Sequence, residues 1–219
     1  MHTTLDLFAS LPPEPPRAVQ IGTHAWVLKG FALPYVEQLL RALARIEEQA
    51  PFRQMITPGG FTMSVALTNC GSLGWTTDRR GYRYASHDPL SQQPWPPMPV
   101  VFLQLADAAA TAAGFAGFVP DACLINRYLP ESRLSLHQDK DERSYDHPIV
   151  SVSLGVPAVF LLGGHARGDK AQRIGLEHGD VVVWGGEDRL RYHGVLPLKP
   201  AEHPLLGAQR INFTLRKAG

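Results

Sequence analysis

The stretch LSLHQDKDE, residues 134–142, carries an imidazole and a carboxylate two positions apart. Side chains at positions i and i+2 of an extended chain project to the same side, so an extended conformation would direct His137 and Asp139 at one point. A single HxD pair fits a catalytic dyad, part of a metal site or a chance arrangement on the surface. A second imidazole would favour a metal, because nonheme Fe(II) is commonly held by two histidines and one carboxylate.

Four later histidines are candidates for that second imidazole, and their surroundings differ. His178 lies in EHGDV, a hairpin-turn signature, so we expect it to shape a turn. His165 lies in a glycine-rich loop, and His147 precedes a proline close to the first pair. His193, in RLRYHGV, comes just before the last segment of the chain, which carries arginines. A distal histidine followed by arginines suits an iron site that also binds an anionic cosubstrate.

The last segment, RINFTLR, alternates polar and apolar side chains. On a strand, one face would carry all of its polar residues: Arg210, Asn212, Thr214 and Arg216. An arginine on this face would offer a carboxylate two parallel N–H donors. The alternative is an antiparallel strand with one face in solvent.

A second polar pair lies in LINRY, where Asn126 and Tyr128 share a face with Leu124. Two interpretations are open for this pair. The side chains would form a buried hydrogen-bonded pair or, if they lie beside Arg210, would add donors for a carboxylate.

Composition limits what the whole chain can be. Of its 219 residues, 44% are apolar and 19% charged, which fits one large domain with a substantial core. The net charge of +1 does not indicate a nucleic-acid partner, and the basic clusters at residues 79–83 and 167–173 are typical of solvated loops. Cys70 and Cys123 are too widely spaced for a disulfide framework, and no CxxC pair suggests zinc. With no signal peptide and no long apolar run, we expect a soluble cytoplasmic protein without a membrane segment.

Two helices and a glycine-rich region are expected before the strands. Residues 1–19, which include LPPEPPR, indicate a flexible proline-rich tail, and residues 20–219 a single domain. Residues 33–50 predict a helix over one face of a sheet, with these apolar side chains on its inner side: Val36, Leu39, Leu40, Leu43 and Ile46. Residues 98–114 predict a second helix that stops at Gly114. Residues 51–99, rich in Gly, Pro, aromatics and Arg without sustained periodicity, are typical of a binding loop or lid.

The remainder of the chain has a β pattern. Short β-branched segments separated by turn residues occur at residues 122–128, 148–155, 158–162, 173–186 and 210–216. Such spacing suggests a sandwich or barrel.

Six motifs in order resemble a known family: LINRY, LSLHQDKDE, PIVSVSLG, LEHGDVVVWGG, RYHG and RINFTLR. Together with APFRQMITPGGFTMSVALTNCGSLGWTT at residues 50–77, they resemble the AlkB family of iron- and 2-oxoglutarate-dependent nucleic-acid dealkylases. The resemblance covers nearly the whole chain after the tail. It implies a mainly β fold with flanking helices, in which residues 120–219 form a double-stranded β-helix (jelly-roll) core and residues 51–99 an N-terminal nucleotide-recognition lid.

The resemblance also implies residues for iron and cosubstrate. The iron ligands would be His137, Asp139 and His193. The residues that bind 2-oxoglutarate would be Asn126, Tyr128, Arg210, Asn212 and Arg216. In this set Arg210 would pair with the distal carboxylate, whereas Asn212 and Arg216 would lie near the carboxylate that chelates iron.

A third implied set would bind the substrate: Thr57, Trp75, Tyr82, Asp141 and Arg167. Trp75 would stack on the damaged base against His137, while Thr57 and Tyr82 would hold the nucleotide backbone. Asp141 would lie near the exocyclic amine of the base. Without the resemblance, Trp75 would be interpreted as a core anchor and Arg167 as a solvated loop residue.

Three positions depart from the family pattern. Leu162 and Ala166 stand where close relatives carry an aromatic and a basic residue, and Asp78 replaces a basic or neutral group near Trp75. These departures leave the implied iron site intact and bear on which lesions and strands are accepted.

The implied reaction is oxidative demethylation of N-alkylated bases in DNA, such as N1-methyladenine and N3-methylcytosine. Fe(II), 2-oxoglutarate and O2 would take part, and formaldehyde and succinate would be released. The expected partner of this monomer is alkylated DNA, preferably single-stranded, with RNA as an alternative. Competing interpretations are an RNA demethylase or protein hydroxylase with the same iron site, and a non-catalytic jelly-roll binding module.

Overall fold

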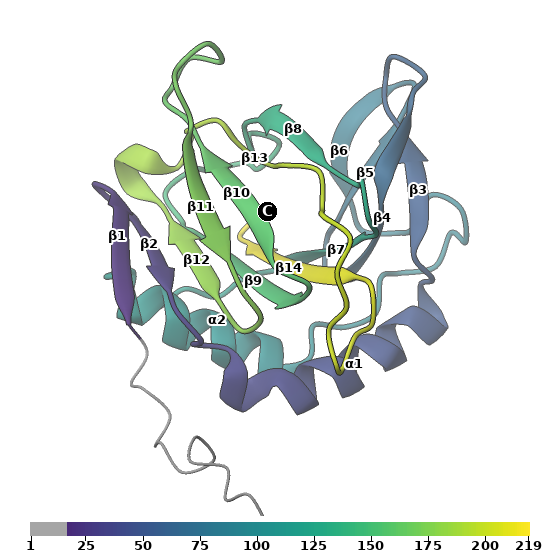
Figure 1. Ribbon diagram of the computed structural model, residues 1–219. Coiled ribbons are helices and arrows are strands. Elements are labelled where there is room, and N and C mark those ends of the chain that lie inside the picture. Colours follow the sequence, from purple (N-terminus) through teal and green to yellow (C-terminus); the bar gives the residue numbers. More distant parts are fainter. Residues whose placement is uncertain (1–16) are drawn as a thin grey trace, which may run out of the picture.

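The computed structural model describes residues 17–219, and it has two facing β-sheets with two helices over the outer face of the larger one (Figure 1). This arrangement is the predicted jelly roll with flanking helices. The larger sheet has the order β1 (Ala18–Gly22), β2 (Ala25–Leu28), β12 (Val181–Trp184), β9 (Ile149–Gly155), β14 (Arg210–Arg216), β7 (Ala122–Tyr128), β4 (Thr62–Gly71) and β3 (Arg53–Ile56).

The smaller sheet and a separate hairpin complete the β structure. The smaller sheet has the order β11 (Gln172–Leu176), β10 (Ala158–Leu162), β13 (His193–Val195) and β8 (Leu134–His137). The hairpin consists of β5 (Gly74–Asp78) and β6 (Gly81–Ala85), which form a two-stranded sheet of their own. Two short 3-10 helices, η1 (Leu33–Tyr35) and η2 (Gly186–Asp188), lie in connections.

The two predicted helices are confirmed, with α1 beginning three residues later than expected and the other three ends within two residues of their expected positions. Helix α1 (Val36–Gln49) follows η1, and α2 (Val100–Ala112) ends before Gly114, which has a positive φ of 89°. The buried positions of α1 are those of the predicted apolar face, with Leu40 partly buried beside them. Neither helix has the length and hydrophobicity needed to cross a membrane, and the same holds for every other helix among residues 17–219.

Two hydrophobic clusters hold the layers together. One joins α1 and α2 to the outer face of the larger sheet, where Ile125, Val152 and Phe213 meet Leu39 and Phe102. The other lies between the sheets and includes these side chains: Tyr128, Ile149, Phe160, Leu162, Val182 and Trp184. The apolar side chains of β14 therefore pack toward the helices, and its polar side chains point into the space between the sheets.

The predicted boundary of the tail is corrected by the structure. Residues 1–16 of the predicted tail lie outside the described residues, but β1 begins at Ala18, inside the range 1–19. β1 pairs antiparallel with β2 at the edge of the larger sheet, so the backbone groups on the β2 side of β1 are paired.

The expectation of little regular structure in residues 51–99 is wrong. This range contains β3, β4, β5 and β6, and β4 pairs with β7 inside the larger sheet. The second half of β4, from Leu67 to Gly71, is buried on both faces, so its sequence lacks the alternation of a half-exposed strand. The larger sheet consequently includes β1 to β4 as well as strands from residues 120–219.

The two cysteines, distant in sequence, face each other in the fold. Cys70 of β4 and Cys123 of β7 are direct partners across the ladder, and both are buried. Burial raises the pKa of the Cys70 thiol well above its usual value, and Cys123 adds to this effect. Both side chains are therefore part of the core beneath the helices.

Candidate active site

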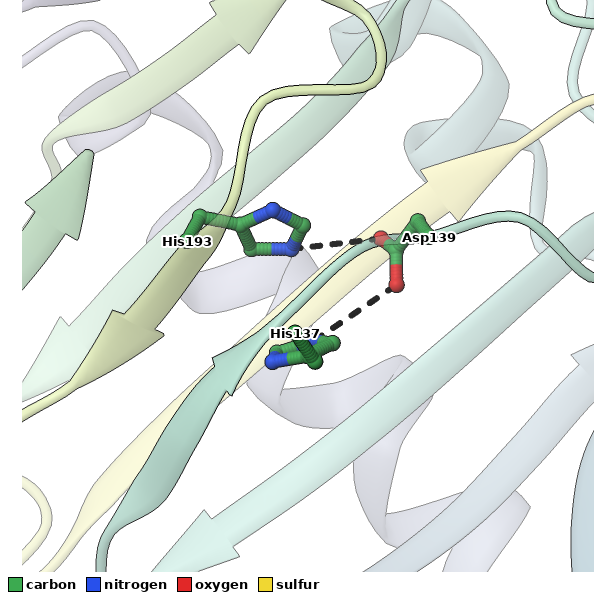
Figure 2. A group of neighbouring side chains, drawn as sticks. All are labelled: His137, Asp139 and His193. Atoms are coloured by element: carbon green, nitrogen blue, oxygen red, sulfur yellow. Dashed lines mark ion pairs between the residues drawn. The ribbon is translucent and has the colours of Figure 1, made fainter. Parts of the chain in front are cut away.

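Three side chains from β8, its following loop and β13 converge between the sheets. His193 of β13 is the direct ladder partner of His137 of β8, and the ring centroids lie 4.4 Å apart. Asp139 reaches toward both rings, with its Oδ1 3.6 Å from His137 Nε2 and its Oδ2 3.5 Å from His193 Nε2 (Figure 2). One ligand atom from each residue lies within 4.8 Å of the other two.

The backbone explains this convergence in a different way from the sequence prediction. β8 ends at His137, so Asp139 belongs to the loop that follows rather than to a continuous strand. On the opposite strand, a Cβ at Gly194 would lie 2.6 Å from the carbonyl oxygen of Leu134. Glycine at this position therefore permits the close approach of β13 to β8 that brings His193 to His137.

Hydrogen bonds fix the tautomers of both imidazoles. His137 Nδ1 lies 2.8 Å from the carbonyl of Ser135, and His193 Nδ1 lies 3.1 Å from the carbonyl of Arg191. Because a carbonyl only accepts, each Nδ1 carries its proton and donates, which leaves the Nε2 lone pairs free at the centre of the cluster. The His137 side chain is 33% exposed at the cavity, yet burial and the nearby His193 lower its pKa to about 4.

Asp139 is held as a carboxylate by arginine. Nε and Nη2 of Arg216 both donate to Asp139 Oδ2, at 2.9 and 2.6 Å, and Nη1 of Arg189 donates to the Asp139 carbonyl at 2.7 Å. Burial raises the pKa of Asp139, but Arg216 and then His193 outweigh it, so the pKa lies well below its usual range. Oδ1 accepts no hydrogen bond among the described residues and is available to a ligand.

The donor set of two neutral imidazoles and one carboxylate fits a divalent transition metal. Two nitrogens and one oxygen on one side of a centre leave its remaining positions open, as in nonheme Fe(II) sites. Within residues 17–219, no other group of three His, Cys, Asp or Glu side chains comes together in this way. His178 lies in the turn between β11 and β12, as predicted, where its Nδ1 accepts the Gly155 N–H at 3.0 Å.

A cavity of about 850 Å³ opens beside the three ligand candidates, and the inner face of β14 forms part of its wall. Arg210 is 2% exposed there, and its Nη2 donates to Ser153 Oγ at 2.9 Å. The guanidinium lies over the ring of Tyr128, 4.8 Å from its centroid. Nε and Nη1 of Arg210 find no hydrogen-bond partner among the described residues. A buried guanidinium with two unsatisfied N–H donors can form a hydrogen-bonded ion pair with the carboxylate of a bound molecule.

The other polar residues of β14 are also buried, so the interpretation of a solvent-facing strand is wrong. Asn212 donates to Ser151 Oγ at 2.8 Å and to the Val152 carbonyl at 3.0 Å, and Thr214 donates to Asn212 Oδ1 at 3.0 Å. Asn126 lies directly opposite Asn212 on β7, and both line the cavity. The strand register therefore brings the two predicted cosubstrate sets together.

Comparison with known proteins agrees with this geometry. The family model described as the 2OG-Fe(II) oxygenase superfamily matches residues 24–216. The chain is 58% identical to the alpha-ketoglutarate-dependent dioxygenase AlkB of Salmonella typhimurium and 57% identical to that of Escherichia coli, with 98% of each chain covered in both cases. The chain belongs to the AlkB family of Fe(II)- and 2-oxoglutarate-dependent dioxygenases.

A solved structure shows the same fold. The one titled "The structure of OsALKBH1" matches 92% of this chain and all of its own, with a TM-score of 0.79 and 27% sequence identity. As a member of the AlkB family, the protein is a dioxygenase that uses Fe(II), 2-oxoglutarate and O2.

The five predicted substrate residues all line the same cavity of this AlkB-family chain. Trp75 stacks on Tyr82 with ring centroids 5.6 Å apart and an interplanar angle of 17°, and its Nε1 donates to Asp141 Oδ2 at 2.8 Å. Arg167 donates to the Leu136 carbonyl at 2.9 Å and lies over the ring of Tyr192. Trp75 is partly buried, packs against a small hydrophobic cluster and also lines the cavity, while Arg167 is tied to the strand that carries His137.

Sequence reasoning missed a buried group behind the metal ligands. Glu142 is buried and ion-pairs with Arg189 at 3.1 Å and with Arg216 at 3.5 Å, and it accepts the Tyr84 hydroxyl at 2.8 Å. In the sequence Glu142 ends the charged run KDE, which is typical of a solvated loop. The signal available in the sequence is its position three residues after Asp139, which places Glu142 close to the residues that hold Asp139.

Two positions that depart from the family pattern, Leu162 and Asp78, have different surroundings in the structure. Leu162 is fully buried in the cluster between the sheets. Asp78 ion-pairs with Arg83 at 2.7 Å and with Arg80 at 3.3 Å, so its carboxylate offsets part of the predicted basic cluster. The hydrogen bond from Arg83, followed by that from the Arg80 backbone, holds the pKa of Asp78 well below its usual range.

Proposed function

We propose that this dioxygenase removes N-methyl groups from alkylated DNA bases, N1-methyladenine and N3-methylcytosine, and releases formaldehyde and succinate. The observation that carries the proposal is one cavity with two kinds of wall: His137, Asp139, His193 and Arg210 on the jelly-roll side, and the stacked Trp75 and Tyr82 on the hairpin side. Membership of the AlkB family supports it.

His137, Asp139 and His193 would hold Fe(II) through the two Nε2 atoms and Asp139 Oδ1. When bound, the metal supplies activation of O2, coupled to decarboxylation of 2-oxoglutarate. Arg210 would receive the distal carboxylate of the cosubstrate on its idle N–H donors, with Tyr128 and Asn126 beside it. Asn212 and Arg216 would lie near the other carboxylate, since both line the cavity.

The hairpin side would present the base. Trp75 offers an aromatic face for stacking, and Thr57 and Tyr82 lie along the same wall for the nucleotide backbone. N1-methyladenine and N3-methylcytosine carry positive charge, and Asp141 provides an exposed carboxylate at the cavity. Such lesions also pair poorly, so they cost less to extrude from a duplex, and single strands need no extrusion at all.

Formaldehyde and succinate release across matched oligonucleotides tests the proposal. We expect both products from oligonucleotides with N1-methyladenine or N3-methylcytosine, most rapidly from single-stranded DNA, and no formaldehyde from unmethylated controls. Release with methylated RNA alone would instead establish an RNA demethylase, and release with proteins alone a protein hydroxylase. If the iron-loaded protein bound these ligands without turnover, the interpretation as a non-catalytic binding module would be the one supported.

The remaining expectations concern organisation. We propose that residues 51–99 act as the lid over the cavity, since Thr57, Trp75 and Tyr82 come from this range. We also expect the protein to be monomeric and cytoplasmic in the cell. Sedimentation with and without a methylated oligonucleotide checks the stoichiometry, with one chain expected in both species.

A further inference from the structure

The β5–β6 hairpin is attached to the loop after β8 at two adjacent carboxylates. Trp75 and Tyr84 are direct partners across the hairpin. Trp75 donates from Nε1 to Asp141 at 2.8 Å, and Tyr84 donates its hydroxyl to Glu142, also at 2.8 Å. The same loop contains the metal-ligand candidate Asp139, so the bonds from the hairpin and the ligand lie within one short segment.

The two attachments differ in burial. Asp141 is exposed at the cavity, whereas Glu142 is 2% exposed in its side chain and is flanked by Arg189 and Arg216. Exchange of the Trp75 bond for one to water or substrate costs little at an exposed carboxylate, but loss of a partner from a buried one costs the desolvation of that group. The Tyr84 bond is therefore the more durable of the two bonds between the hairpin and this loop.

Arg216 continues this attachment to the metal ligand. Its Nη1 lies 3.4 Å from the Tyr84 hydroxyl oxygen, which accepts from it, while its Nε and Nη2 hold Asp139 Oδ2. Arg189 connects the same two points, with Nη2 3.1 Å from Glu142 and Nη1 donating to the Asp139 backbone. A displacement of Tyr84 would therefore be transmitted to Asp139 through a single side chain, that of Arg216.

We propose that Tyr84 and Glu142 are positioning residues that couple the β5–β6 hairpin to the metal ligand Asp139. When metal and cosubstrate fix Asp139 and Arg216, the hairpin becomes more ordered, and when the hairpin closes on a base, Asp139 is held in its ligating orientation. The coupling is reciprocal because metal binding and hairpin closure both stabilise the same hydrogen-bonded group of side chains. The part that concerns a base rests on the proposed function, but the metal-to-hairpin part does not.

The hydroxyl of Tyr84 is the part of the side chain that matters here. Burial raises the pKa of Tyr84 well above its usual value, so the phenol stays protonated and can donate to Glu142. A phenylalanine would fill the same space and remove only the hydroxyl contacts, namely this bond and the longer one from Arg216 Nη1. Glu142 would then keep its two arginines, so the change isolates the hairpin attachment from the buried charges.

Hydrogen exchange measured on Tyr84→Phe tests the coupling without nucleic acid. In the unchanged protein, Mn(II) with 2-oxoglutarate should slow amide exchange in residues 74–85, and in Tyr84→Phe this slowing should be lost. Affinity for Mn(II) should fall about 10-fold, as for loss of an outer-shell partner. Tyr35→Phe, a matched hydroxyl deletion at the end of η1, should behave like the unchanged protein.

A second pair of measurements separates positioning from general damage. With a methylated oligonucleotide, Tyr84→Phe should raise the ratio of succinate to formaldehyde about fivefold or more. Glu142→Gln keeps an acceptor for Tyr84 and should retain much of the metal-dependent slowing. Unchanged exchange and unchanged Mn(II) affinity in Tyr84→Phe would overturn the proposal. Absence of formaldehyde from every oligonucleotide with the unchanged protein would refute only the proposed function.

Discussion

The inner face of β14 and the β5–β6 hairpin border the same cavity but are held in different ways. Every residue of β14 is buried, and the strand is paired with β7 on one side and β9 on the other. The hairpin is a two-stranded sheet of its own, and Tyr82 is 50% exposed on it (Figure 1). Polar groups on β14 therefore have fixed geometry, whereas those on the hairpin depend on a few side-chain bonds.

This difference matches a division of labour between chemistry and recognition. Groups that hold a metal and a charged cosubstrate need positions fixed to a fraction of an ångström, which a central strand provides. A surface that accepts several alkylated bases benefits from aromatic faces on a lightly attached element, because stacking tolerates different bases. Substitutions on the two walls should accordingly affect different steps.

The largest effect is expected from the metal ligands. Replacement of His137, Asp139 or His193 by alanine should each abolish 2-oxoglutarate turnover and weaken Mn(II) binding by more than the ~100-fold typical of outer-shell changes. Titration calorimetry and succinate release measure the two effects. His178→Ala, a histidine outside the cluster, should retain both, and normal turnover by His193→Ala would refute the ligand assignment.

Arg210→Lys tests the cosubstrate wall with a smaller change. Lysine keeps the positive charge but loses the planar fork, so the KM for 2-oxoglutarate should rise about 10- to 100-fold, equivalent to one or two charge-assisted hydrogen bonds. Affinity for Mn(II) in the absence of cosubstrate should stay near that of the unchanged protein. A KM equal to that of the unchanged protein would mean that another residue binds the carboxylate.

Trp75→Ala tests the hairpin wall. Loss of a stacking face costs about 1–3 kcal/mol, so demethylation of N1-methyladenine in single-stranded DNA should fall roughly 5- to 150-fold. Decarboxylation of 2-oxoglutarate without DNA should change far less, because no metal or cosubstrate residue is altered. Equal losses of both activities would show that the two walls do not act separately, whereas repair at the parental rate would remove the base-binding role of the hairpin.

The smallest effect is expected from Asp78→Asn. The change removes one negative charge and frees Arg80 and Arg83 from their shared carboxylate. Nucleic-acid affinity should rise, and the logarithmic salt dependence of binding should steepen by about one phosphate contact. Replacement of Arg79, Arg80 and Arg83 together should flatten that dependence without a change in base preference. A salt dependence that neither substitution alters would place the phosphate contacts elsewhere.

Some features of the fold were predictable from local patterns. The apolar face of α1 and the stop at Gly114 depend on residues within one segment, and both are confirmed. Among the strands of residues 51–99, β4 was missed because its second half is buried on both faces, which removes the alternation on which the prediction relied.

For the site, the sequence by itself determined the chemical types: an HxD pair, a distal histidine and a strand with polar residues at every second position. Tertiary structure decided which groups meet. The register of β8 and β13 brings His193 to His137, the approach at Gly194 permits it, and packing of the two sheets buries Arg210 with two idle donors. Glu142 became part of the site only through burial between Arg189 and Arg216. Periodicity and side-chain chemistry are properties of a segment, whereas register, burial and charge pairing arise when distant segments pack, so only the folded chain shows them.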